Sequence, residues 1–100
     1  MNIEIKEQNG SYLGILTGWI DTAEASQFLE DLKTLMANAN KSIELDCAQL
    51  EYICSLGLRG LFQLKQESAA KGGSLFLTHV GGEVEKILRL TGFDKLLDIR

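Results

Sequence analysis

Leu50-Glu51-Tyr52-Ile53-Cys54-Ser55-Leu56-Gly57-Leu58-Arg59-Gly60-Leu61 is the stretch of this 100-residue chain that decides the fold. An apolar, strand-like segment, residues 42–46, precedes it, and an amphipathic helix pattern begins at Ser55. Ser55 therefore falls where the loop after a strand becomes the first turn of a helix. Such a turn presents unpaired backbone N–H groups and the positive end of a helix dipole, so a hydroxyl there can cap the helix or carry a phosphate.

Strand and helix patterns alternate on both sides of this stretch. An N-terminal hairpin is predicted around Asn9-Gly10, because both residues accept positive φ. Its second strand is continuously apolar, which predicts burial on both faces. The first predicted helix starts at Asp21, has an apolar stripe that reaches Met36, and ends near Asn38 or Asn40. The other predicted elements are helices from Ser55 to the Gly72-Gly73 stop and from Gly82 to Gly92, strands over 42–46, 74–78 and 96–99, and a loop over 47–54.

This element order, ββαβαβαβ, predicts an α/β fold. The hairpin contributes an antiparallel pair, and the strands that alternate with helices are expected to be parallel and joined by right-handed crossovers. The predicted architecture is therefore a mixed β-sheet covered by helices. The length suits one domain over residues 1–100.

Composition and charge narrow the classes of partner. The net charge is −4, and the ten basic residues are scattered, so no basic stripe for nucleic acid is visible. No apolar run approaches the roughly 20 residues that span a bilayer, and the N-terminus lacks the shape of a signal peptide. We therefore expect a cytoplasmic protein that binds neither nucleic acid nor membrane.

Metal, cofactor and catalytic chemistry find little support in the sequence. Cys47 and Cys54 are seven residues apart, which is not a zinc spacing, and His79 is the only histidine. Gly57 and Gly60 fit neither the Walker nor the dinucleotide-binding loop. No metal, cofactor or enzymatic activity is expected, and a small enzyme or nucleotide-binding protein is the least favoured function.

Three segments in order resemble the STAS domain, specifically the bacterial anti-sigma factor antagonists. Thr17-Gly18-Trp19-Ile20-Asp21 is similar to the T/A-G-E-hydrophobic-D segment of that family. Residues 46–61 are similar to its D-S core, and residues 72–77 with 87–93 to its closing G-G-x-L-x-L and T-G-L/F segments. The family has aspartate, glutamate and a small or hydroxyl residue where this chain has Cys54, Trp19 and Leu56.

The resemblance implies a phosphorylation switch. In the family, a kinase that is also the anti-sigma factor phosphorylates the serine of the core, and a serine phosphatase reverses the reaction. The unphosphorylated antagonist binds the kinase and releases a sigma factor, which regulates transcription. Ser55 matches the phosphorylated position, and the predicted partner-binding residues around it are Asp21, Trp19, Cys54, Leu56, Gly57, Leu58 and Arg59.

Each of these residues also has a plainer interpretation. Ser55 and Asp21 are good helix N-caps, and Gly57 can simply let the helix pack close to a strand. Cys54 is either a reactive thiol at a helix N-terminus or a small, partly buried residue. Trp19 is either an exposed interface anchor or a core residue. The alternative function is a STAS adaptor in a transporter or stress-signalling complex, in which Ser55 only caps the helix.

Overall fold

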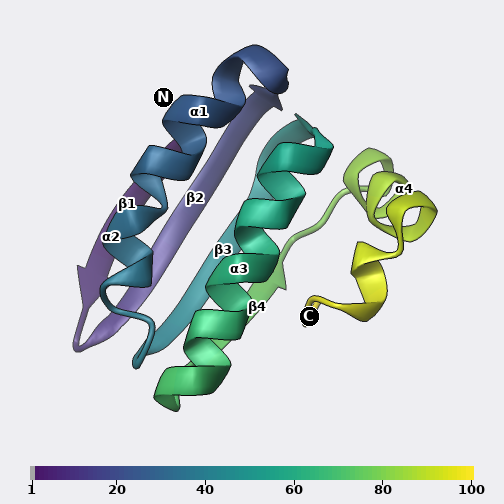
Figure 1. Cartoon of the computed structure of the whole chain (residues 1–100). Coiled ribbons are helices and arrows are strands. Elements are labelled where there is room, and N and C mark those ends of the chain that lie inside the picture. The colour runs from purple at the N-terminus through teal and green to yellow at the C-terminus, as the bar shows by residue number, and fades with distance from the viewer. Residues whose placement is uncertain (1) are drawn as a thin grey trace.

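The computed structural model describes residues 2–100 and shows a four-stranded mixed sheet (Figure 1). Strands β1 (Ile3–Gln8) and β2 (Ser11–Ile20) form the antiparallel hairpin, and Asn9 and Gly10 both have positive φ in its turn. Strands β3 (Ser42–Ile53) and β4 (Ser74–Thr78) follow in parallel, so the spatial order is β1-β2-β3-β4. The predicted mixed α/β sheet is confirmed.

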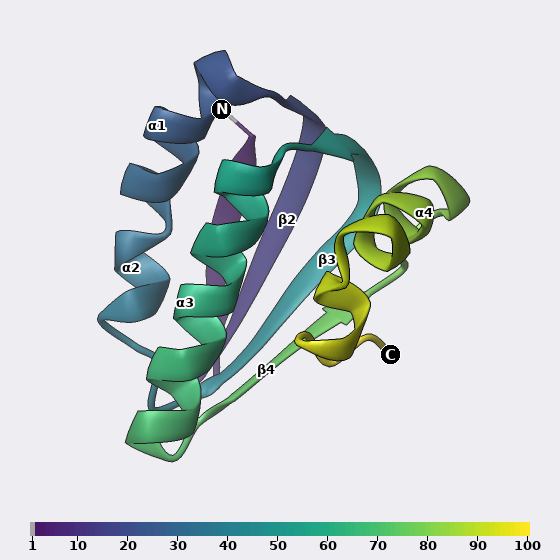
Figure 2. The same cartoon turned by 45° about the vertical axis from the view of Figure 1, so that its right-hand side comes forward.

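The helices connect the parallel strands and cover one face of the sheet. Helices α1 (Thr22–Asp31), α2 (Lys33–Met36) and α3 (Ser55–Lys71) lie side by side on that face (Figures 1 and 2). Helix α4 (Gly82–Thr91) and the short 3-10 helix η1 (Phe93–Lys95) lie beside β3 and β4 (Figure 2). No helix of residues 2–100 is long and apolar enough to cross a membrane.

The core lies between the helices and the inner face of the sheet. Strand side chains alternate between the two faces, and the inward ones are almost fully buried. They meet the apolar stripes of the helices, as the sequence pattern predicts. The core includes Ile3, Leu16, Ile43, Leu45, Leu75 and Leu77 from the strands and Phe28, Leu32, Leu35, Leu58, Leu61 and Leu64 from the helices.

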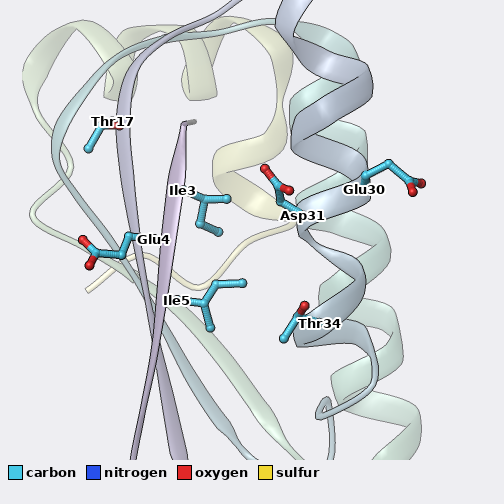
Figure 3. A pocket seen from close by; sticks show the side chains of 7 residues that line it. All are labelled: Ile3, Glu4, Ile5, Thr17, Glu30, Asp31 and Thr34. Carbon is cyan, nitrogen blue, oxygen red and sulfur yellow. The ribbon is translucent and has the colours of Figure 1, made fainter.

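Burial of β2 on both faces was wrongly predicted. Gly14 and Leu16 face the core, whereas Leu13 and Ile15 are half-buried on the opposite face. That face carries polar side chains from the neighbouring strands, such as Glu4, which points away from the helices (Figure 3). An apolar run therefore does not require two covered faces, since an outward strand position tolerates Leu or Ile when its neighbours are polar.

Three element boundaries also differ from the prediction. Strand β3 continues through residues 47–53, the predicted loop, because backbone pairing with β2 carries it past two register shifts despite its polar residues. The helix over residues 21–36 is divided at Leu32 into α1 and α2. The strand over 96–99 is reduced to one parallel bridge between Ile99 and Leu77.

Candidate functional site

Ser55 lies at the carboxyl end of the parallel strands, where β3 turns into α3. The backbone N–H of Cys54 donates to the carbonyl oxygen of Ile20 (2.9 Å), and the N–H of Leu58 donates to the carbonyl oxygen of Cys54 (3.0 Å). Cys54, with extended backbone, is therefore the N-cap residue, and Ser55 is the first helical residue. The prediction that the helix begins at Ser55 is confirmed, whereas the plainer interpretation of Ser55 as its N-cap is off by one residue.

This placement leaves the Ser55 hydroxyl at an uncapped, positive helix end. The first turn of α3 holds no acidic residue, and no side chain accepts a hydrogen bond from its N–H groups. Ser55 is exposed. Because the first N–H groups of a helix have no intrahelical partner, they are available to an anion. A phosphoryl group on this serine would therefore meet a favourable electrostatic environment.

Four of the predicted partner-binding residues are in positions that solvent reaches. Leu56 is 45% exposed and Trp19 is 57% exposed, and Arg59 is exposed on α3. The exposure of Trp19 decides between its two interpretations in favour of a surface residue. The half-buried Asp21 accepts a hydrogen bond from the N–H of Glu24 (3.0 Å), so its predicted role as the N-cap of α1 is confirmed.

The other three predicted partner-binding residues, Cys54, Gly57 and Leu58, are buried. A Cβ on Gly57 would lie 2.7 Å from Cγ1 of Ile53, so this glycine allows α3 to approach the end of β3. That contact supports the packing interpretation of Gly57. A role for these three residues in partner binding stays a prediction that their burial does not support.

The two cysteines are free, buried thiols. Burial, with a smaller contribution from the charge of Asp46, raises the pKa of the Cys47 thiol to about 12. Cys47 is therefore protonated and unreactive near neutral pH. Residues 2–100 contain no group of three or more His, Cys, Asp or Glu side chains that could hold a metal ion.

Sequence reasoning missed one surface next to this site. Trp19 and Tyr52 are paired in register on β2 and β3, and their rings stack with centroids 4.5 Å apart and planes inclined by 22°. They border a cavity of about 420 Å³, which we name the aromatic groove. It is lined by Trp19, Leu50, Glu51, Tyr52, Gly81, Gly82, Glu83, Val84 and Ile87.

No sequence signal brings Trp19 and Tyr52 together, because their register depends on the shift between Gly18 and Trp19. Gly18 has a positive φ of 75°, a conformation that glycine adopts at no steric cost. Gly18 can be read from the sequence, but the pairing of Trp19 with Tyr52 cannot.

A separate cavity of about 450 Å³ lies between β1 and the helices α1 and α2 (Figure 3). Its lining residues are Ile3, Glu4, Ile5, Thr17, Glu30, Asp31 and Thr34. The Oδ1 atom of Asp31 accepts a hydrogen bond from Gln27 (2.9 Å), whereas its Oδ2 atom is buried without a partner among the described residues. None of the predicted site residues lines this cavity.

Comparison with known proteins shows what the chain is similar to. It is 25% identical over 93 residues to BtrV of Bordetella bronchiseptica, which is described as an anti-sigma factor antagonist; the match covers 93% of this chain and 80% of BtrV. The fold is similar to the crystal structure of a Thermotoga maritima protein with the same description. The TM-score is 0.82 at 22% identity, over 97% of this chain and 84% of that one.

The fold is also similar to SpoIIAA of Bacillus in its phosphorylated form. Here the TM-score is 0.72 at 15% identity, over 98% of this chain and 90% of SpoIIAA. The family model of the STAS domain matches residues 2–100. The chain therefore belongs to the STAS domain family.

Proposed function

We propose that this protein is an anti-sigma factor antagonist whose binding to an anti-sigma factor kinase is controlled by phosphorylation of Ser55. One observation carries the proposal: the Ser55 hydroxyl is exposed at the uncapped N-terminus of a 17-residue helix. The descriptions of BtrV and of the Thermotoga maritima protein support it. SpoIIAA, a structural neighbour, has been solved in phosphorylated and unphosphorylated forms.

In this proposal the unphosphorylated protein occupies the kinase and releases the sigma factor. The protein itself performs no catalysis and contacts no nucleic acid, and it works in the cytoplasm. A serine phosphatase returns Ser55 to its free form. Transcription is therefore regulated indirectly, through the occupancy of the kinase.

Physical chemistry explains how one phosphate would change binding without unfolding the domain. A phosphoserine carries a charge of about −1.5 to −2 at neutral pH and offers three acceptor oxygens. The first turn of α3 can donate N–H groups to it and has no acidic side chain to repel it. The exposed apolar side chain of Leu56 follows Ser55 directly in the first turn of α3. A partner that covers Leu56 would have to desolvate the nearby phosphate, which weakens the complex.

The proposal is tested by identifying the bound partner and mapping the modification. Immobilised protein is used to capture proteins from a lysate of the source organism, and the captured kinase is then supplied with ATP. We expect one phosphate on Ser55 by mass spectrometry, none on Ser55→Ala, and wild-type phosphorylation of Ser26→Ala, a control at another exposed helical serine. Phosphorylated protein should no longer capture the kinase, whereas Ser55→Ala should retain it.

Two outcomes would contradict the phosphorylation switch. The first is a phosphate that maps elsewhere or leaves kinase binding unchanged. The second is capture of a transporter ATPase or a stress-signalling scaffold in place of a kinase, which would favour the adaptor function. In that case Ser55 would be a structural residue of the first turn of α3.

A further inference from the structure

We propose that the aromatic groove receives an arginine side chain of the partner protein, an inference that rests on the proposed function. The groove lies between the ends of β2 and β3 and the first turn of α4. It is therefore a second contact surface near the end of β3, which shares only Trp19 with the partner-binding residues predicted around Ser55. Its aromatic stack, its charge and its available carboxylates each favour a guanidinium group.

The aromatic wall of the groove is partly exposed. Tyr52 covers one face of the Trp19 indole, with ring centroids 4.5 Å apart, and Trp19 is still 57% exposed. Part of the indole is therefore accessible to a partner from the groove that Trp19 lines. Tryptophan is the strongest aromatic site for a cation, and a planar guanidinium can stack on it.

The charge of the groove is negative. Two of its lining residues, Glu51 and Glu83, are acidic, and none of its described lining residues is basic. Both carboxylates are exposed, and neither forms an ion pair with any of residues 2–100. An incoming cation therefore does not have to displace an existing partner.

The positive end of α4, which borders the groove, is offset by its own side chains. Glu83 and Glu85 occupy the first turn of this helix. Acidic residues in that position neutralise the helix dipole locally. The start of α4 has no side-chain cap either, but the carboxylates of its first turn distinguish it from the start of α3, whose first turn holds no acidic residue.

These features select arginine over other occupants. A carboxylate binds a guanidinium through two parallel N–H···O bonds, while the plane of the guanidinium stacks on an aromatic ring. Lysine, a strongly hydrated point charge, can use the negative charge but cannot stack in this way. A neutral aliphatic side chain would leave both carboxylates partly desolvated and unpaired.

The experiment uses capped tripeptides as probes and the full chain as receptor. Gly-Arg-Gly is compared with Gly-citrulline-Gly, which has nearly the same shape without charge, and with Gly-Lys-Gly. Trp19 is the only tryptophan, so its fluorescence reports on the groove, and amide NMR shifts of Glu51, Gly81 and Gly82 map the binding. We expect saturable binding of the arginine peptide with a Kd in the millimolar range, at about −4 kcal/mol.

Matched variants test the carboxylates. The double variant Glu51→Gln/Glu83→Gln should bind the arginine peptide about tenfold more weakly, the loss of one charge-assisted interaction. Glu85→Gln is the control, because Glu85 is on the same helix, pairs with Arg89 (3.6 Å) and does not line the groove. It should bind as the wild type does. The proposal would be overturned if the citrulline or lysine peptide bound as tightly as the arginine peptide, or if the double variant bound the arginine peptide as the wild type does. It would also be overturned if the arginine peptide gave no saturable response up to about 20 mM.

This experiment fails or succeeds separately from the test of the proposed function. Ser55→Ala should bind the arginine peptide like wild type, since Ser55 does not line the groove. Phosphorylation of Ser55 without arginine binding would remove only the groove proposal. Arginine binding without phosphorylation would instead remove only the switch.

Discussion

Gly57→Ala is expected to destabilise the domain, although alanine is normally the better helix residue. In an unobstructed helix the change from glycine to alanine is worth roughly 0.5–1 kcal/mol of stabilisation. Here the new methyl would lie 2.7 Å from Cγ1 and 3.0 Å from Cδ1 of Ile53. Carbon atoms are most stable about 3.5–4.0 Å apart, so the contact is close to 1 Å too short.

The surroundings of Ile53 limit how the clash can relax. Ile53 is buried, and its branched Cβ restricts the rotation of χ1. A further retreat of the new methyl is blocked on another side by Cγ2 of Ile20, 3.6 Å away. Overpacking of this kind costs about 1–3 kcal/mol, so after the gain in helix propensity the net expected loss is centred on about 1 kcal/mol and reaches at most about 2.5 kcal/mol.

Urea unfolding followed by circular dichroism measures this loss. For a small domain the slope is about 1–3 kcal/mol per molar urea, so the midpoint should fall by about 1 M. Gly82→Ala is the matched control, because Gly82 is in the first turn of α4 with nothing within 4 Å of a new Cβ. The Gly82→Ala protein should be more stable than the wild type. The double variant Gly57→Ala/Ile53→Val removes the 3.0 Å contact with Cδ1, so it should lose less stability than the sum of the two single variants.

A Gly57→Ala protein as stable as wild type, beside a stabilised Gly82→Ala, would refute the packing argument. It would favour the other interpretation of Gly57, in which the absence of a side chain allows a partner's backbone to approach. Stability and kinase capture measured on the same variant then separate the two roles. A loss of capture without a loss of stability is the signature of the partner role.

Three further predictions concern the helix starts and the buried thiol. Asp21→Ala should lower the free energy of unfolding by about 1 kcal/mol in urea titration, because it removes the N-cap bond to the N–H of Glu24; an unchanged midpoint would show that this bond contributes little. Ser55→Glu should be more stable than Ser55→Gln by about 0.3–1 kcal/mol at low salt, because the added carboxylate would be the first acidic group at the positive end of α3. This difference in stability should disappear in 1 M salt. Equal stability of the two variants at low salt would contradict an uncapped, positive helix end. Folding raises the pKa of Cys47 from 9.0 to about 12, so the unfolded thiol ionises first and stability falls as the pH rises through that range. Relative to neutral pH, the loss should reach about 2 kcal/mol at pH 10.5, with a slope that approaches 1.4 kcal/mol per pH unit above pH 9. Cys47→Ala should lack this part of the slope, and identical pH profiles of the two proteins would disprove the shift.

Much of the fold was predictable because it follows local patterns. The Asn9-Gly10 turn and the apolar stripe of α1 specify their elements through neighbouring residues alone. The extension of β3 to Ile53 was not predictable, because a polar segment becomes a strand there only through pairing with β2. The end of the chain is similar: Ile99 forms a bridge to Leu77 that no local pattern specifies.

The candidate site was predictable in its location and less so in its details. Ser55, at the junction of strand and helix, stands out because both patterns meet there. Cys54 rather than Ser55 is the N-cap because the backbone N–H of Cys54 donates to the carbonyl oxygen of Ile20, which lies 34 residues earlier in the sequence. The stack of Trp19 on Tyr52 likewise depends on a register shift in the sheet. Contacts of this kind arise from tertiary pairing, which a single sequence does not display.

The strand order β1-β2-β3-β4 has a consequence for how the chain emerges from the ribosome. Each strand after β1 pairs with the strand synthesised immediately before it, so no strand has to be inserted later between two strands that are already in the sheet. We expect cotranslational assembly from the N-terminus, since domains fold during synthesis and sequential pairings close the shorter loops. The Ser55 turn would be in place once α3 covers β2 and β3. The aromatic groove would be completed later, because Gly81 to Ile87 are among the last of its residues to be made.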